Sequence, residues 1–427
     1  MIPTTPPLLI LSDAILPMEG ADTAIIGRAG VITHNGLILG VGTASDLRTK
    51  FGDLPEQYIP GVMLPGFINA HVHLELGYQR GKIPFPGHFT KWVAQLMQNY
   101  PAPEQLETVI TQAVREGIAE SLSFGVTCVG DISRRCSISR SALAKGNLHA
   151  VSFGEVVGLG RMRNVADQLL QTVEADNKSE WTTIAVSPHA PFTVEGPVLK
   201  KILTHALAKK MPVAMHLAEH PEEKDFLRDL SGPFGRDWDV MLKMNILDDA
   251  IPQMDGGPIR WAKHWGLLDA AHELPVILAH VNYAGAAELD LLANSPASVA
   301  YCPRTRAYFG HDATTKHPYR EMLDAGINVC LGTDSLASNP DLSILREASF
   351  LWKRDRGNPY SLLEMITRRA AAALGMQADR GTLRTGKTAD LIVLPIDPKN
   401  RTSTDVMTEI LTQAPTPRAV WTRGTRI

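Results

Sequence analysis

The stretch PGFINAHVH, residues 65–73, suggests both the fold and the start of a site. Its apolar run, Phe67–Ala70, predicts a short buried strand that ends at two histidines. Residues two apart on an extended chain point to the same side, so the His71 and His73 imidazoles can reach one metal ion. A histidine pair of this spacing also occurs by chance. The pair therefore predicts a metal site only if other strand ends supply partners.

Seven more short apolar strands follow along the chain, and longer segments of helical spacing lie between them. The predicted strands are Val126–Gly130, Ala150–Val156, Thr183–Val186, Val213–His216, Val276–His280, Ser298–Cys302 and Asn328–Gly332. The clearest helical segments are Thr108–Ser123, Gly196–Lys210 and Pro318–Ala325. Strands that are apolar on both faces indicate a parallel sheet covered by helices. Eight such units favour a closed (β/α)8 barrel of the TIM type.

Both ends of the chain have a different pattern, typical of antiparallel sheet. Asn35-Gly36 lies between two β-rich runs and predicts a tight hairpin. After Gly381 the β pattern returns, with predicted strands at Asp390–Leu394 and Ala419–Thr422. Chain ends often lie close together in folded domains. We expect residues 1–63 and 381–427 to form one small composite β-sandwich domain, and residues 64–380 to form the barrel.

The composition of the 427 residues is that of a globular protein, with 44% hydrophobic and 20% charged residues. A formal net charge of −3 and the lack of a lysine and arginine block argue against a nucleic-acid-binding protein. No apolar run has the length of a membrane span, and the first residues lack a basic leader. The four cysteines are scattered, which favours reduced thiols and a cytoplasmic location.

Polar residues of ligand type end several of the predicted strands. One strand ends at His216 with Glu219 three residues later, another ends at His280, and the last is followed by Asp334. Active sites of TIM barrels lie at the C-terminal ends of the strands. Histidines and a carboxylate gathered there would bind Zn²⁺ or Fe²⁺ and leave a position for water. A single histidine at a strand end is more often structural, but four such ends together favour a metal site.

These motifs resemble the amidohydrolase superfamily. PGFINAHVH is similar to the strand-one signature of its cytosine deaminase and chlorohydrolase-like branch, which includes S-adenosylhomocysteine, methylthioadenosine and aminodeoxyfutalosine deaminases. The other matching pieces are SPHAPFT at 187–193, HLAE at 216–219, CPR at 302–304, GTDS at 332–335 and GKTADL at 386–391. The resemblance covers nearly the whole chain and implies a metal-dependent hydrolase.

The resemblance implies a role for each polar residue at the strand ends. His71, His73, His216 and Asp334 would hold one divalent ion, with Zn²⁺ expected and Fe²⁺ as the alternative. The ion would lower the pKa of a bound water towards about 7, and Asp334 would accept its proton. His280 would orient this water and stabilise charge, and its alternative role as a direct ligand stays open.

Glu219 is the residue that points to deamination. In deaminating relatives the matching glutamate carries a proton between water and a ring nitrogen. The alternative is a solvated helix residue, because Glu222 and Glu223 follow and look solvated. The stretch Thr182–His189, which contains the predicted fourth strand, carries no lysine that could bridge a second metal ion, which favours a site with one ion.

Five further residues are candidates for binding the substrate. His189 is expected to face the substrate or to be held by its own loop, and Trp92 either stacks on a ring or packs in the core. Many relatives have Ser-Asn where this chain has arginines after Cys302-Pro303. Arg304, Arg306 and Arg161 are expected either to clamp a carboxylate or phosphate of an anionic substrate or to form ion pairs within the protein.

The leading hypothesis is a metal-dependent aminohydrolase that deaminates an adenosine-derived or related aminated heterocycle. One alternative is hydrolysis of another C–N or a C–Cl bond, as in a cyclic amide or a chlorotriazine. Another is a barrel scaffold without catalysis. The expected partner is a small molecule, and a homo-oligomer is left open. The long segment between Glu219 and Leu274 either shapes the site or is a peripheral helical addition.

Overall fold

The computed structural model describes residues 6–175 and 179–427. Its larger sheet contains eight strands in the order in which they follow along the chain, and every neighbouring pair is parallel. These strands are β6 (Phe67–Val72), β7 (Val126–Ser133), β8 (His149–Val156), β9 (Thr182–Pro188), β10 (Val213–Leu217), β11 (Val276–His280), β12 (Ser298–Tyr301) and β13 (Asn328–Leu331). A parallel bridge between Val72 and Asp334 joins the first strand to the segment after the last. The predicted (β/α)8 barrel is confirmed.

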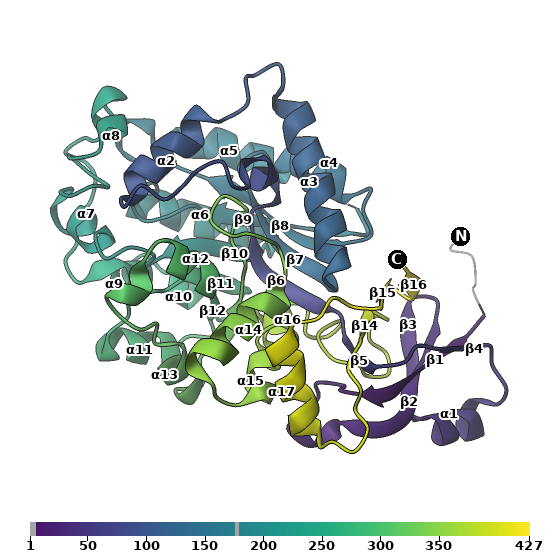
Figure 1. The fold of residues 1–427 in the computed structure, drawn as a ribbon. Helices are drawn as coiled ribbons and strands as arrows, with labels where there is room; N and C mark the ends of the chain where they lie inside the picture. The colour runs from purple at the N-terminus through teal and green to yellow at the C-terminus, as the bar shows by residue number, and fades with distance from the viewer. Residues whose placement is uncertain (1–5, 176–178) are drawn as a thin grey trace.

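The barrel strands are buried on both faces, as the continuous apolar runs predict. Every residue of β6, β7, β10, β11 and β12 is buried. Helices surround these strands on the outside (Figure 1). The helices between consecutive barrel strands are α2 (Phe89–Gln98), α3 (Leu106–Ser123), α4 (Cys136–Leu143), α5 (Val165–Glu174), α6 (Gly196–Lys209), α7 (Glu223–Asp229), α8 (Asp239–Lys243), α9 (Gly257–His264), α10 (Leu267–Ala270), α11 (Ala286–Ala293), α12 (Pro303–Tyr308) and α13 (Tyr319–Asp324).

Further helices follow the last barrel strand and add to the layer of helices around the barrel. They are α14 (Ile344–Asp355), α15 (Pro359–Glu364), α16 (Arg368–Ala373) and α17 (Ser403–Gln413). The helix α17 packs against α14 and α15, where the Trp352 indole donates a hydrogen bond to Thr412 at 3.1 Å. Short 3-10 helices lie at Ala21–Thr23, Leu74–Gln79, Gly160–Met162 and His311–Ala313.

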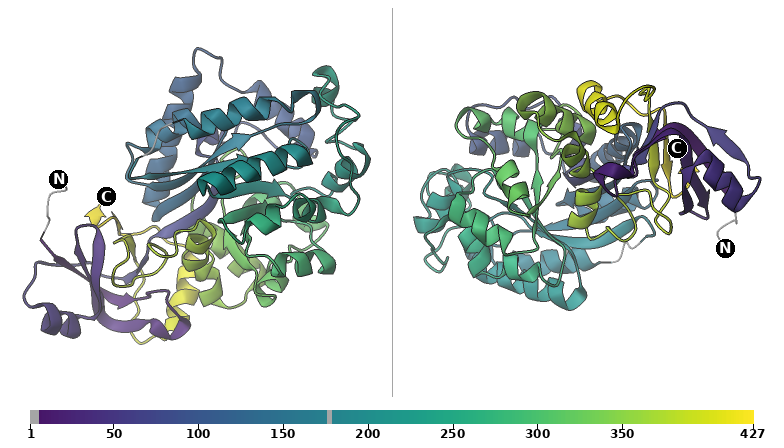
Figure 2. Two further views of the ribbon diagram at one scale, coloured as in Figure 1. Left: turned by 180° about the vertical axis from the view of Figure 1, so that it is seen from behind. Right: turned by 90° about the horizontal axis from the view of Figure 1, so that it is seen from below.

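A second sheet combines the two ends of the chain, which lie side by side in Figures 1 and 2. Its order is β16-β15-β14-β5-β1-β2-β3, and β4 pairs with β1. The strands are β1 (Leu8–Ile15), β2 (Ile25–His34), β3 (Leu37–Thr43), β4 (Glu56–Tyr58), β5 (Val62–Pro65), β14 (Leu391–Leu394), β15 (Ala419–Thr422) and β16 (Thr425–Arg426). Helix α1 (Ala44–Phe51) follows β3.

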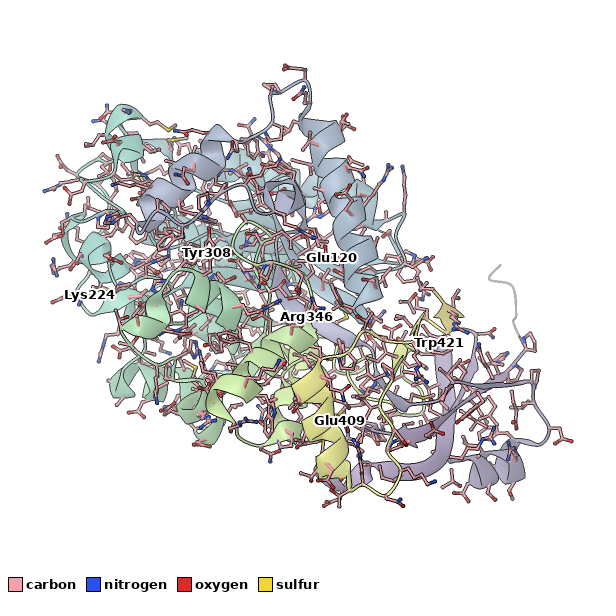
Figure 3. The ribbon with its side chains drawn as sticks, in the orientation of Figure 1. Glu120, Lys224, Tyr308, Arg346, Glu409 and Trp421 are labelled. Atoms are coloured by element: carbon pink, nitrogen blue, oxygen red, sulfur yellow. The ribbon has the colours of Figure 1, made fainter. Side chains whose placement is uncertain are left out.

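The turn at Asn35 and Gly36 joins β2 to β3 as predicted, with positive φ at both residues. Strand β5, which crosses the expected domain boundary at residue 63, belongs to this sheet through its antiparallel pairing with β14. Trp421 of β15 is buried in the same layer (Figure 3). Residues 1–5 of the expected domain lie outside the described residues.

Among the described residues, no helix has the length and apolar character needed to cross a membrane. The four cysteines are buried and unpaired.

Candidate active site

Three histidines of strands β6, β10 and β11, the histidine directly after β6 and the carboxylate after β13 come together at the C-terminal end of the barrel. The Nε2 atom of His73 lies 3.2 Å from that of His216 and 3.4 Å from Oδ1 of Asp334. The Nε2 atom of His71 lies 3.8 Å from the same carboxylate oxygen. The structure thus places the sequence-predicted ligands around one point.

This group of atoms fits a divalent cation. Ligand atoms of His71, His73 and Asp334 lie within 4.8 Å of one another, and so do those of His71, His216 and His280. Both ring nitrogens of His71 are buried without a hydrogen-bond partner, although buried polar atoms are normally paired. A cation bound at Nε2 would satisfy one of them. Nitrogen donors with one carboxylate are typical ligands of Zn²⁺ and Fe²⁺. Since His280 belongs to one of the two groups, its alternative role as a ligand stays open.

The four histidines have ring nitrogens without a proton, whose lone pairs can bind a cation. The Nδ1 atom of His216 donates a hydrogen bond to the His189 carbonyl at 3.0 Å, so its Nε2 atom faces the cluster without a proton. Burial lowers the pKa of His216 to about 4, and burial lowers the pKa values of His71, His73 and His280 well below the ordinary range. All four imidazoles are therefore neutral at pH 7.

Asp334 is oriented as an acceptor beside His71 and His73. The Ser338 hydroxyl donates a hydrogen bond to its Oδ2 at 2.9 Å, which leaves Oδ1 facing His71 and His73. Burial raises the pKa of Asp334 to about 7. A carboxyl group with this pKa can take up and release a proton near neutral pH.

The strand ends that carry these side chains have unusual backbone. Ala218, His280, Val281 and Asp334 adopt positive φ angles of 51°, 70°, 47° and 57°. This conformation costs energy for a residue other than glycine, most of all for β-branched Val281. Hydrogen bonds between neighbouring strand ends hold it: the Val281 N–H donates to the Leu217 carbonyl, and the Asp334 N–H to the His71 carbonyl. Such strain is typical of functional sites.

Glu219 lies directly beside the cluster. Its Oε1 atom is 3.7 Å from Nε2 of His280 and 3.8 Å from Nε2 of His220. Burial and the nearby Asp334 raise its pKa well above the ordinary value, so this carboxyl group can hold a proton at neutral pH. The side chain is buried. The alternative of a solvated surface residue is therefore wrong.

Glu223 was expected to be solvated, and this expectation is also wrong. Its side chain is buried at the start of α7, and its carboxylate accepts hydrogen bonds from the backbone that carries Glu219. The run Glu222-Glu223-Lys224 has the charge pattern of a surface helix. Nothing in that pattern separates the one buried carboxylate from its exposed neighbours.

His189 lies next to the metal ligands, with its ring 5.1 Å from that of His216. Its Nδ1 atom is also hydrogen-bonded to Thr193 of its own loop at 2.7 Å. The expected alternative, a histidine held by its own loop, therefore describes its surroundings. Whether the ring also contacts substrate stays a prediction.

The two arginines after β12 face protein carboxylates. Arg304 donates to Glu347 at 2.5 Å and to Asp341 at 3.1 Å. Arg306 is fully buried, and its Nε atom donates to Asp312 at 3.0 Å. These contacts correspond to the ion pairs expected as the alternative. These ion pairs engage the guanidinium groups of Arg304 and Arg306, which were expected to clamp an anionic substrate.

Neither Arg161 nor Trp92 lines the aromatic pocket that is described in the next paragraph. Arg161 is exposed on the 3-10 helix after β8. Trp92 is buried in an aromatic cluster, with its ring 5.7 Å from that of Phe89 and 5.1 Å from that of Phe309. The packing role expected as the alternative for Trp92 therefore describes its place in the fold.

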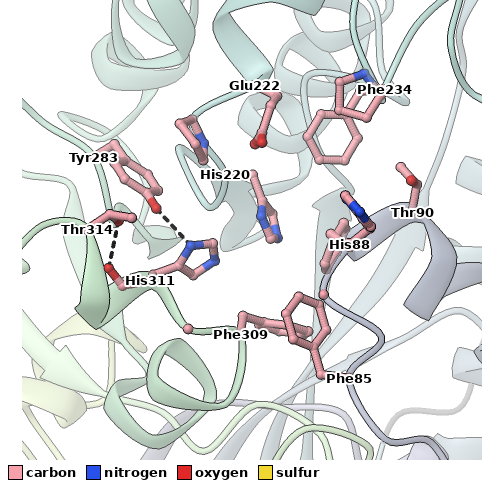
Figure 4. A pocket seen from close by; sticks show the side chains of 15 residues that line it. Phe85, His88, Thr90, His220, Glu222, Phe234, Tyr283, Phe309, His311 and Thr314 are labelled. Atoms are coloured by element: carbon pink, nitrogen blue, oxygen red, sulfur yellow. Dashed lines mark hydrogen bonds between the residues drawn. The ribbon is translucent and has the colours of Figure 1, made fainter.

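A pocket of about 290 Å³ is lined in part by His220, whose Nε2 atom lies 3.8 Å from Oε1 of Glu219 (Figure 4). Its walls come from the segment before α2, the turn after β10, the long segment that follows, and the loops after β11 and β12. Aromatic side chains dominate the lining, with polar groups between them: Phe85, Phe89, Phe234, Phe309, His88, His220, Glu222, Tyr283 and His311. The long segment after Glu219 thus shapes the pocket through Phe234.

The polar side chains of the pocket were missed by the sequence analysis because no motif singles them out: His220 and Tyr283 follow β10 and β11 by three residues, and His311 lies in a 3-10 helix. The Nε2 atoms of His220 and His311 are buried without a hydrogen-bond partner, and the His311 Nδ1 is bonded to the Tyr283 hydroxyl at 2.7 Å (Figure 4). Within the described part of the chain, the lining contains neither a lysine nor an arginine.

Known proteins resemble the chain over almost its full length. A curated relative from Pelotomaculum thermopropionicum, a 5-methylthioadenosine/S-adenosylhomocysteine deaminase, is 29% identical over 91% of this chain and 84% of its own. The crystal structure of Helicobacter pylori aminofutalosine deaminase superposes with a TM-score of 0.83, at 22% identity, over 99% of this chain and 100% of its own.

A third similar protein is the atrazine chlorohydrolase of Arthrobacter aurescens, solved with zinc. Its TM-score is 0.78 at 19% identity, over 98% of this chain and 94% of its own. At such identities the solved structures show the common fold alone. The family model described as "Amidohydrolase family" matches residues 62–427, which include the whole barrel and the strand-end cluster. The chain belongs to the amidohydrolase family.

Proposed function

We propose that this chain is a metal-dependent aminohydrolase that removes the amino group of an adenosine-derived heterocycle as ammonia. The observation that carries the proposal is the buried Glu219 carboxyl, whose Oε1 atom lies 3.7 Å from His280 of the histidine cluster and 3.8 Å from His220, which lines an aromatic pocket. A group that can donate a proton is thereby placed beside a group of metal-ligand type. The names of the curated relatives support the same reaction and substrate class.

The ligands of the proposed ion are His71, His73, His216 and Asp334, and the proposed ion is Zn²⁺. The zinc in the similar chlorohydrolase structure supports this choice. When bound, such an ion polarises a water molecule and makes it nucleophilic at neutral pH. The neutral imidazoles and the single carboxylate suit this ion, and they leave room for water and substrate.

The protein's own groups move the protons of the reaction. Addition of water to an amidine-like carbon requires protonation of the adjacent ring nitrogen. The raised pKa of Glu219 lets this carboxyl donate such a proton, and the raised pKa of Asp334 lets that group accept one from the water. The Nε2 atom of His280, in the histidine cluster, lies 3.7 Å from the Glu219 carboxyl, and His280 can stabilise the developing charge.

The pocket is the proposed site for the rest of the substrate. Its phenylalanine rings provide flat apolar surfaces for a heterocycle, and the unpartnered Nε2 atoms of His220 and His311 can hydrogen-bond to oxygen atoms on it. Since Arg304 and Arg306 face protein carboxylates, they no longer support an anionic substrate.

The test is a substrate panel with three independent readouts. The protein with its bound metal is incubated with adenosine, methylthioadenosine, S-adenosylhomocysteine, cytosine and a chlorotriazine, while ammonia, chloride and the ring absorbance are followed. Ammonia release from an adenosine derivative, abolished in Asp334→Asn, is the expected result. Chloride or a ring-opened product without ammonia would contradict the deaminase proposal. Unchanged activity of zinc-free protein would contradict the proposal of Zn²⁺ as the bound ion.

A further inference from the structure

Glu223 holds the turn that carries Glu219. One of its carboxylate oxygens, Oε2, accepts a hydrogen bond from the Ala218 N–H at 3.0 Å. The other, Oε1, accepts hydrogen bonds from the Glu219 N–H at 2.6 Å and the His220 N–H at 3.0 Å. Three consecutive backbone donors therefore point at one side chain. This side chain is 1% exposed, whereas the next residue, Lys224, is exposed at the surface (Figure 3).

The turn is a conformation that the chain does not adopt without support. Ala218 has a φ of 51°, a left-handed value that is unfavourable for alanine. Because of this reversal, the N–H groups of three residues turn to the same side. They are buried, so without Glu223 they would lack an acceptor, at a cost of about 1–3 kcal/mol for each unpaired group. The carboxylate thus stabilises the turn directly.

The other edge of the turn is held by Asn282, after β11. The Asn282 N–H donates to the Ala218 carbonyl at 2.9 Å, and its side-chain amide donates to the Glu219 carbonyl at 3.1 Å. The peptide groups on both sides of Glu219 are therefore fixed, one edge by Glu223 and the other by Asn282. The Glu219 side chain is left free to point towards His280.

We infer that Glu223 is a positioning residue for Glu219: its carboxylate fixes the turn at 218–220 and so aims the Glu219 carboxyl at the reacting atoms. The inference rests on the proposed function, because it assigns the proton transfer to Glu219. Groups that transfer protons must lie within hydrogen-bonding reach of their target, and small displacements are costly. Glu223 does not contact the substrate. It acts through the backbone of Glu219.

The test is a double-mutant cycle on kcat and KM for ammonia release. Glu223→Gln keeps the size of the side chain but replaces one acceptor oxygen with an NH2 group that opposes the backbone donors. We expect kcat to fall about 10–100-fold, the usual range for groups that orient others, while KM changes less than about threefold. In a Glu219→Gln background the same substitution should lower kcat less than about threefold, because the carboxyl group that Glu223 positions is already absent.

The matched control is Asp225→Asn, which removes another carboxylate of the same helix. Asp225 is partly exposed and pairs with Arg228 at the surface, so kcat should stay unchanged. If Glu223→Gln does not fold, Asn282→Ala tests the other edge of the same turn, with the same expected dependence on Glu219.

Equal losses from Glu223→Gln in the presence and absence of the Glu219 carboxyl would show a purely structural role and overturn the inference. An unchanged kcat in a folded Glu223→Gln variant would do the same. A wild-type protein that releases no ammonia from any adenosine derivative would refute the proposed function first, and the inference with it. The two failures are therefore distinguishable.

Discussion

Two turns at the C-terminal end of the barrel are built in the same way and carry different side chains. After β10 the Glu223 carboxylate accepts three backbone hydrogen bonds from the turn that carries Glu219. After β7 the buried Glu75 carboxylate accepts hydrogen bonds from the Ser133 hydroxyl at 2.6 Å and from the N–H groups of Arg134 and Arg135 at 2.9 Å each. A buried carboxylate is thus a general means of fixing a strand end in this barrel.

The difference between the two turns lies in what they hold. The first presents a buried carboxyl group beside the histidine cluster, and the second presents the exposed side chains of Arg134 and Arg135. The same kind of support should therefore affect stability at both turns but catalysis mainly at one. Four predictions test this contrast, and they follow from the largest expected effect to the smallest.

The largest effect is expected from His73→Ala, compared with Glu75→Gln two residues later. His73 faces the cluster, while Glu75 faces the β7 turn. The His73 variant should lose its bound metal and at least about 100-fold in kcat/KM, since even groups that only orient ligands contribute about 10–100-fold. Metal content by elemental analysis is the measurement. Full metal content in the His73 variant would contradict the proposed ligand set.

Glu219→Gln should lower kcat by about 10²–10⁴-fold, the range typical of a general acid or base. The substitution removes a carboxyl that burial already holds away from its charged form, so the melting temperature should change little. Metal content, melting temperature and kcat are measured on the same preparation. A variant with normal metal content and near-normal kcat would remove Glu219 from the mechanism.

Glu75→Gln and Glu223→Gln should both lower the free energy of unfolding, by about 1–3 kcal/mol for each donor left unpaired. Only the second should lower kcat by more than about threefold, because only its turn carries a group of the proposed mechanism. Denaturant unfolding and steady-state kinetics on both variants make the comparison. Equal losses of kcat would mean that any strained strand end in this barrel is enough to disturb catalysis.

The smallest effect concerns pH. Burial raises the pKa of Glu223 to about 7 from an ordinary value of 4.5. Its folded form keeps the proton after the unfolded form has lost it, so stability should fall as pH rises from 4.5 to 7. Glu223→Gln should remove this contribution, which is at most about 1.4 kcal/mol per pH unit. Parallel stability curves for wild type and variant, with Asp225→Asn as the control, would contradict it.

The fold was predictable because its signal is local. Each barrel strand is a short apolar run, and burial on both faces follows from such a run. The strands begin and end within a few residues of their predicted bounds, as with Val276–His280, which the structure reproduces as β11. The polar residues at the strand ends were predictable for the same reason, since the barrel gathers strand ends on one face.

The partners of long side chains were less predictable. Glu347 lies 43 positions from Arg304 along the chain, and no pattern around Cys302-Pro303 indicates that it will take up the guanidinium. Glu223 was missed because three backbone donors converge on it only after the chain reverses at Ala218. The pocket lining was missed because most of its side chains come from loops and helix ends, where neither helical nor strand periodicity applies.

The seam between the first and last barrel strands has a consequence for how the protein is made. Asn69 and Thr333, 264 positions apart, exchange two hydrogen bonds, and the His71 carbonyl accepts the N–H of Asp334. During translation the two histidines of the first strand therefore leave the ribosome long before the carboxylate that completes their ligand set. A metal ion held by the proposed ligand set would therefore find all its ligands only after the ring of strands has closed.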